Sequence, residues 1–242
     1  MNILFLMAGT DRSGNKDNNY PIVLTEIENK PLIQWQIEFA EAIPDAKFIF
    51  AIKEEYLKKF HLGNVIELLS PNSKFVSINE KTKGSACTAL MAVEYINSDE
   101  PLLILNSDEI VKTNYLEVIQ EFQKKNLDAG AIVFNSVHPR YSFLKVDPQT
   151  GLVVEASEKN PISKNATAGF YYFKHGKDFV TSAQSMIKKG ASIEGDFYIC
   201  PTFNELILNQ AKIGVHQIDV NHYIPLKSEA NVTNLQNGFG KE

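Results

Sequence analysis

The sequence predicts an α/β fold: a three-layer α/β/α sandwich around a mixed, mostly parallel sheet. Through the first half of the chain, apolar runs of strand length alternate with helical segments, as they do in βαβ units. In the second half, after residue 127, short strands follow one another across tight turns, which is a more antiparallel pattern. One sheet covered by helices on both faces accommodates both patterns.

The first half supplies the parallel part of this sheet. Residues 2–7 (NILFLM) are almost entirely apolar and end at Ala8-Gly9, as a buried strand does where it enters a turn. Pro31 fits the first turn of the next helix, because a missing N–H is no loss there. Further strands are predicted at residues 47–52, 75–78 and 102–105. Helices are predicted at residues 31–42, 54–60, 65–69, 85–96 and 114–125.

The second half adds strands joined by short turns. The clearest turn signal is Asp147-Pro-Gln-Thr-Gly151, where proline and glycine lie between two apolar runs. Strands are predicted at residues 129–135, 142–147, 152–156, 168–173 and 212–220. Helices are predicted at residues 177–188 and 201–208.

Composition excludes several classes of protein. With 44% hydrophobic and 22% charged residues among 242, the chain is ordinary for a globular protein and not disordered. The net charge of −5 argues against nucleic acid as a partner, because such binding depends on Lys and Arg neutralising phosphates. No apolar run approaches the roughly 20 residues of a membrane helix. We therefore expect a soluble, cytoplasmic protein. The two cysteines and five histidines have no metal-binding spacing.

The segment after the first strand is one candidate site. Ligands of such sheets bind at the carboxyl ends of the strands, where residues 8–19 form a long polar loop. Gly9 and Gly14 would allow backbone N–H groups to meet phosphate oxygens, and Arg12 and Lys16 add positive charge. An ordinary βα turn explains the local pattern equally well.

A second candidate follows the strand at residues 102–105. Asp108 lies just beyond its carboxyl end, where a carboxylate can hold Mg²⁺ together with substrate phosphates. The competing interpretation is that Asp108 caps the turn that follows.

Two further segments have both a functional and a structural explanation. Gly84, Ser85 and Ala86 open a helix with small side chains, which leaves room either for a flat base or for tight packing on the sheet. Glu158-Lys159 could hold a hydroxyl and a phosphate, although an exposed ion pair is the commoner role of such a dipeptide.

Taken in order, these segments resemble the sugar-phosphate nucleotidylyltransferases, which have a glycosyltransferase-A-like fold. The resemblance is strongest to small members found in bacterial surface-polysaccharide gene clusters. The matching stretches are LFLMAGT (4–10), YPIVLTEIENKPLIQWQIE (20–38), TKGSACTALMAVEYI (82–96), DEPLLILNSDEIV (99–111), EKNPISKNATAGFYYF (158–173) and DFYICPTFNELI (196–207).

The resemblance implies an enzyme in which a phosphate monoester attacks the α-phosphorus of a nucleoside triphosphate and releases pyrophosphate. It also implies Mg²⁺ as cofactor, a product used for capsule or lipopolysaccharide synthesis, and compatibility with a homodimer. A single domain is expected over residues 1–242, with a nucleotide-binding half (1–126) and an acceptor-binding half (127–242). The residues carried over are Ala8, Gly9, Thr10, Gly84 and Ser85 for the nucleotide, Asp108 for Mg²⁺, and Glu158, Lys159, Gly169, Asp196 and Asn204 for the acceptor.

The chain departs from the family pattern in its cations. Asp11 replaces the second glycine of the usual loop, and Ser13 stands where an arginine is expected. Ile22 stands where the family has a lysine that steadies the triphosphate. With both family cations replaced, Arg12 and Lys16 are the residues we expect to supply positive charge in catalysis.

Two alternatives remain open at this point. The missing lysine and arginine, and the lack of an evident second metal-binding aspartate beyond a substitute at Asp219, favour a weakened relative that binds a nucleotide and acts as a regulatory subunit. A glycosyltransferase of the same fold would need an Asp-x-Asp motif, and Asn106 stands where its first aspartate would be.

Overall fold

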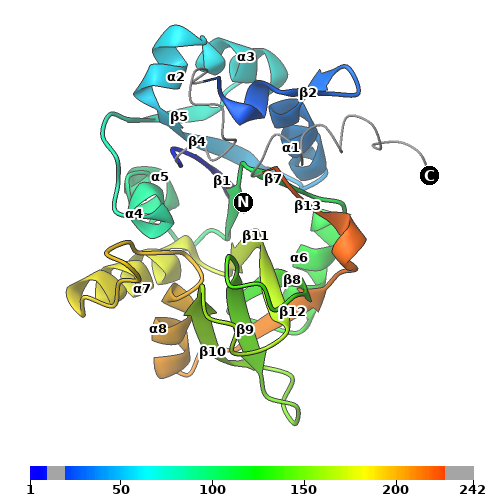
Figure 1. The fold of residues 1–242 in the computed structure, drawn as a ribbon, viewed down its shortest axis with the longest axis vertical. Helices are drawn as coiled ribbons and strands as arrows, with labels where there is room; N and C mark the ends of the chain where they lie inside the picture. Colours follow the sequence, from blue (N-terminus) through cyan, green and yellow to red (C-terminus); the bar gives the residue numbers. More distant parts are fainter. Residues whose placement is uncertain (10–19, 227–242) are drawn as a thin grey trace.

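A computed structural model describes residues 1–9 and 20–226 of the chain. Within them a nine-stranded mixed sheet runs through the molecule (Figure 1). Its order is β10-β9-β11-β6-β1-β4-β5, with β8 paired to β11 and β12 paired to β8. The strands are β1 (Asn2–Met7), β4 (Lys47–Lys53), β5 (Lys74–Ile78), β6 (Leu102–Asn106), β8 (Ala129–Asn135), β9 (Ser142–Val146), β10 (Val153–Glu158), β11 (Asn165–Phe173) and β12 (Ile213–Gln217).

Helices cover both faces of the sheet, because successive apolar side chains of β1 point to opposite faces and both sets are buried. Ile3 and Phe5 belong to the core under α1, α2, α3 and α6, whereas Leu4 and Leu6 belong to the core under α4, α5, α7 and α8. The helices are α1 (Leu32–Glu41), α2 (Glu54–Lys59), α3 (Leu62–Leu69), α4 (Ser85–Leu90), α5 (Val93–Ile96), α6 (Tyr115–Lys124), α7 (Gly176–Lys188) and α8 (Thr202–Leu208). The predicted three-layer α/β/α sandwich is confirmed.

Parallel pairing is confined to the strands that carry the βαβ pattern and to the β12–β8 pair. β1 pairs in parallel with β4 and β6, and β4 pairs in parallel with β5. β11 is antiparallel to β6, and this pairing joins the two halves of the chain in one sheet. The division into a nucleotide half and an acceptor half stays a prediction.

One predicted helix and one predicted strand have clearly different bounds in the structure. The helix expected at residues 85–96 breaks into α4 and α5, because the N–H groups of Met91 and Ala92 bond three residues back rather than four. The strand expected at residues 212–220 ends at Gln217, and the side chain of Asp219 caps a 3₁₀ turn (Val220–His222).

Two short ribbons that the sequence pattern does not predict form separate two-stranded sheets. β7 (Glu109–Val111) pairs with β13 (Tyr223–Pro225), and β2 (Glu26–Ile27) pairs with β3 (Lys30–Pro31). Runs of two or three residues are too short to show a period. The β7–β13 ribbon lies directly after β6, so it bears on the site described next. No helix in the described ranges is long and apolar enough to span a membrane.

Candidate active site

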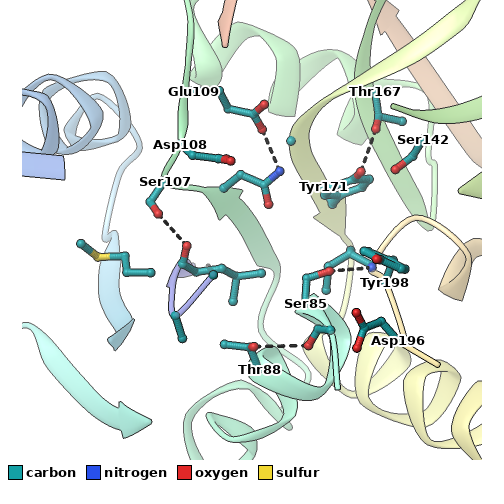
Figure 2. A pocket seen from close by; sticks show the side chains of 18 of the residues that line it. Ser85, Thr88, Ser107, Asp108, Glu109, Ser142, Thr167, Tyr171, Asp196 and Tyr198 are labelled. Atoms are coloured by element: carbon teal, nitrogen blue, oxygen red, sulfur yellow. Dashed lines mark hydrogen bonds between the residues drawn. The ribbon is translucent and has the colours of Figure 1, made fainter. Parts of the chain in front are cut away.

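A cavity of about 280 Å³ opens at the carboxyl ends of β1 and β6 (Figure 2). Ala8 and Gly9 from the end of β1 and Asp108 from the end of β6 line it. The start of α4 and the antiparallel strands β9, β10 and β11 complete the wall. This is the edge of a parallel sheet at which ligands are expected to bind.

A hydrogen bond fixes the two strand ends relative to each other. The buried hydroxyl of Ser107 donates to the backbone oxygen of Leu6 (2.7 Å), so the end of β6 is tied to the end of β1. The next residue, Asp108, lines the cavity, and its backbone oxygen accepts from the N–H of Leu226 (2.8 Å). The carboxylate of Asp108 is thus carried on a backbone that is held from two sides.

The side chains beside Asp108 suit a hard cation. The described residues contain no cluster of three His, Cys, Asp or Glu side chains, so a metal bound at Asp108 would have at most two such side chains from this part of the chain. Asn106 and Ser107, which line the same wall, add only oxygen and nitrogen donors. Mg²⁺ takes oxygen ligands and is often held by one or two carboxylates plus substrate phosphates and water, so the donor set fits it.

Next to Asp108 lies a buried carboxylate that was not predicted from the sequence. Glu109 is 5% exposed, and its side chain accepts hydrogen bonds from Asn106 Nδ2 (2.8 Å) and from the Tyr223 hydroxyl (2.5 Å). Burial, and then the nearby charge of Glu109, raises the pKa of Tyr223 well above its ordinary value, which keeps the phenol protonated as a donor. Tyr223 is on β13 and Glu109 on β7, so this hydrogen bond lies within the short ribbon, whereas the bond from Asn106 joins the ribbon to the end of β6.

The start of α4 is locked against a segment more than a hundred residues away. The Phe197 N–H donates to the oxygen of Lys83 (2.9 Å), and the Ala86 N–H donates to the oxygen of Phe197 (3.0 Å). Gly84 has a φ of +90°, and a Cβ there would lie only 2.7 Å from the Phe197 nitrogen. Glycine is therefore required at this position by both backbone conformation and space. The Ser85 hydroxyl accepts from the Ile199 N–H (3.3 Å), which leaves its own proton for a ligand.

The opposite wall is a polar network on β9, β10 and β11. The Ser142 hydroxyl donates to the buried carboxylate of Glu158, and the hydroxyls of Thr167 and Tyr171 bond to each other (2.7 Å). Burial, followed by the charges of Cys200 and Glu158, raises the pKa of Tyr171 well above its ordinary value. All four side chains of the network line the cavity and can exchange hydrogen bonds with a polyhydroxylated ligand.

Most residues selected from the sequence meet in this cavity. The predicted residues that line it are Ala8, Gly9, Gly84, Ser85, Asp108, Glu158, Lys159, Gly169 and Asp196. Figure 2 shows the carboxylates of Asp108 and Asp196 on opposite sides of the space. Thr10, Arg12 and Lys16 lie outside the described residues.

Two sequence-based assignments are not supported by the geometry. Asn204 does not line the cavity, because its amide bonds to both the N–H and the oxygen of Ala156 (2.8 Å each) and so joins α8 to β10. Asp219 accepts from the Asn221 N–H (2.8 Å), so it caps a turn and is not among the residues at the cavity.

Several lining residues were not predicted. They come from turns and from the antiparallel strands, and neither the local patterns nor the resemblance assigned them a role: Lys81, Glu109, Arg140, Tyr141, Ser142, Thr167, Tyr171 and Tyr198. Ile22 and Val23 also line the cavity, so the position at which a lysine was expected presents apolar surface.

Comparison with known proteins identifies a matching family and distant relatives. A family model described as "Nucleotidyl transferase" matches residues 20–197. The bifunctional protein GlmU of Thermosipho melanesiensis is 26% identical over 179 residues, which cover 72% of this chain and 37% of that protein. The chain thus spans well under half the length of this curated relative.

Two solved structures share the fold over nearly the whole chain. The nucleoside-diphosphate-sugar pyrophosphorylase from Vibrio cholerae superposes with a TM-score of 0.84 at 19% identity, covering 98% of this chain and 100% of that one. A UDP-glucose pyrophosphorylase complexed with UDP-glucose superposes with a TM-score of 0.74 at 16% identity, covering 98% and 97%. At these identities the likeness concerns the fold.

Proposed function

Because the chain belongs to the nucleotidyl transferase family, we propose that it transfers a nucleoside monophosphate from a nucleoside triphosphate to a phosphorylated sugar and releases pyrophosphate. The observation that carries this proposal is a single cavity with Asp108 at the strand ends on one side and the Glu158-Lys159 pair on the other. The two substrates must meet in one space for such a transfer, since positioning and charge neutralisation supply most of the catalysis.

The reaction needs no covalent enzyme group. An oxygen of the acceptor phosphate attacks the α-phosphorus, a new P–O bond forms, and the bond to the leaving pyrophosphate breaks in line with it. When bound at Asp108, Mg²⁺ supplies charge that neutralises the triphosphate and polarises the α-phosphate. In this proposal the backbone at Ala8 and Gly9 approaches the phosphates, and Ser85 contacts the base.

The remaining residues bind the acceptor and balance the negative charge of the leaving pyrophosphate. Lys159 faces the acceptor phosphate, and Glu158 accepts hydrogen bonds from its sugar hydroxyls. Arg12 and Lys16 balance the charge that develops on the leaving pyrophosphate. We assign the product to capsule or lipopolysaccharide precursor synthesis and the assembly to a homodimer, both from the family resemblance. We place the protein in the cytoplasm from its sequence composition.

One observation favours a second function, a regulatory subunit that binds a nucleotide or nucleotide-sugar without turning it over. Ile22 lines the cavity where the family resemblance leads us to expect a lysine, and an apolar side chain provides no charge for a triphosphate. Single electrostatic donors at such sites are worth about 3 kcal/mol of transition-state stabilisation, enough to reduce turnover severely.

A pyrophosphate-release assay separates the two functions. The wild-type protein is incubated with each of the common nucleoside triphosphates, Mg²⁺ and a panel of sugar 1-phosphates, and Asp108→Asn serves as the inactive control. Release with at least one pair supports the transferase. Nucleotide binding by calorimetry without release from any pair would overturn it in favour of the regulatory subunit.

A further inference from the structure

Lys159 already has an anionic partner in the structure. Its ammonium lies 2.5 Å from a carboxylate oxygen of Glu194, and it also lies over the ring of Tyr198, 5.3 Å from the centroid. Lys159 and Tyr198 line the cavity, and Glu194 does not. The Lys159 side chain is 29% exposed, whereas that of Glu194 is 72% exposed. Glu194 therefore neutralises the ammonium of Lys159 from the solvent side of the cavity.

Both members of this pair are held in an unusual backbone conformation. Lys159 has a φ of 56° and Glu194 a φ of 55°, both in the left-handed region that favours glycine and asparagine. Glu194 and Gly195 form a two-residue turn closed by hydrogen bonds between Ile193 and Asp196 (2.8 and 3.0 Å). Glycine or asparagine would fit the first position of this turn better than glutamate does. An exposed ion pair contributes little to the free energy of unfolding, so folding stability alone does not account for a glutamate at position 194.

The turn that carries Glu194 has a fixed position. Two residues beyond it, Phe197 is bonded to Lys83 and Ala86 at the start of α4. On the other side, the Lys159 N–H donates to the oxygen of Tyr141 (2.9 Å). The backbones of the two charged residues are thus anchored separately, and only their side chains need to move for the pair to separate.

We propose that Glu194 sets the affinity of this site for the acceptor, because in the free protein its carboxylate takes the place of the acceptor's anionic group on Lys159. This inference rests on the proposed function, because it assumes that Lys159 receives the acceptor phosphate. Binding then exchanges one anion for another on the same ammonium. Glu194 lowers affinity for an anionic acceptor by competing for Lys159 and by repelling a second negative charge beside it.

The test is the affinity for inorganic phosphate, measured by titration calorimetry without turnover. Glu194→Gln removes the competing charge with little change in size, and we expect phosphate to bind about two- to fivefold more tightly, the scale of an exposed ion pair. Glu54→Gln is the matched control: Glu54 pairs with Lys58 (2.7 Å) on α2, does not line the cavity, and undergoes the same charge change. It should leave the dissociation constant unchanged.

A double-mutant cycle with Lys159→Gln assigns the effect to the pair. In that background, Glu194→Gln should no longer tighten binding. The proposal would be overturned if Glu194→Gln bound phosphate no more tightly than the wild type, or if neither protein bound it measurably. It would also be overturned if Glu194→Gln tightened binding equally in the Lys159→Gln background. If the protein proves inactive with every substrate pair yet phosphate binding follows the cycle, the transferase function fails and the role of Glu194 stands.

Discussion

The carboxylate of Glu109 occupies the space that a side chain on Gly169 would need. A Cβ on Gly169 would overlap Oε1 of Glu109 and lie 2.6 Å from Nδ2 of Asn106. Gly169 sits at a register irregularity of β11 with a φ of +62°, and Glu109 starts β7. A glycine of β11 and the carboxylate next to Asp108 are therefore packed as one unit in the wall of the cavity.

Replacing Gly169 by alanine should displace this unit. The new methyl group has no space, and the left-handed backbone adds strain, so we expect a loss of about 2–4 kcal/mol in the free energy of unfolding. Urea denaturation measures it. Gly190→Ala is the matched control, because Gly190 has a φ of +65° with nothing within 4 Å of its Cβ position. It should cost about 1 kcal/mol, the backbone part alone. Equal losses in the two variants would contradict the packing argument.

Asp108→Asn should abolish Mg²⁺-dependent turnover while the protein stays folded. The amide keeps the size of the side chain but loses the negative charge that a divalent cation requires, so we expect turnover to fall by roughly 100-fold or more. Binding of Mn²⁺ by electron paramagnetic resonance, in the presence of nucleotide, gives a second readout independent of turnover. Asp45→Asn, an exposed change far from the cavity lining, serves as the control. Retention of tight Mn²⁺ binding by Asp108→Asn would remove Asp108 from the metal site.

Buried thiol and phenol groups should make the protein labile at alkaline pH. Burial is the first cause of a raised pKa at Cys200, Tyr171 and Tyr223, whose ordinary values are 9.0, 10.0 and 10.0. The folded state thus keeps protons that the unfolded state releases, and stability is lost as the pH rises above about 9. Urea denaturation at pH 8, 9.5 and 10.5 should show a falling free energy of unfolding.

Single cysteine variants test which residues cause the free energy of unfolding to fall with rising pH. Cys200→Ala should reduce the decline between pH 8 and 9.5, where the thiol of the unfolded chain begins to ionise. Cys87→Ala should reduce it less, because Cys87 is only half-buried, although desolvation also raises its pKa. A free energy of unfolding that stays constant from pH 8 to 10.5 would contradict the expected direction.

The sequence was most informative where one local pattern determines an element. The apolar run of β1 (Asn2–Met7) and the turn between β9 and β10 are examples. In that turn Gly151 has a φ of +70°, and its N–H donates to Asp147 (2.8 Å), as the proline and glycine predict. The strand-end position of Asp108 could likewise be predicted, because it depends only on where an apolar run stops.

What the sequence did not reveal depends on contacts between distant segments. The Glu109–Tyr223 hydrogen bond joins residues 114 positions apart, and the resemblance gave neither residue a role. Asn204 was assigned to the acceptor from its place in a family-like stretch, but two hydrogen bonds with Ala156, 48 positions away, use both ends of its amide. Such roles are set by the packing of whole elements, which local periodicity does not encode.

The last prediction concerns the charge at position 22. A triphosphate bound with one Mg²⁺ keeps a net negative charge, and the leaving pyrophosphate gains more as its bond breaks, so a cation must meet it in a partly desolvated site. Ile22 lines the cavity and provides none. In the transferase we therefore expect Lys16→Ala or Arg12→Ala to lower turnover roughly tenfold or more.

Ile22→Lys should leave turnover unchanged or raise it, and in the Lys16→Ala background it should restore part of the loss, because the new ammonium enters the wall of the same cavity. Ile22→Met is the control, since it has comparable length without charge and preserves the apolar contact of Ile22 with the core. Pyrophosphate release under saturating substrates measures all of these variants. If Arg12 and Lys16 both prove dispensable in an active protein, or if Ile22→Met rescues Lys16→Ala as well as Ile22→Lys does, then the charge of the leaving group is met elsewhere and this account of the cations is wrong.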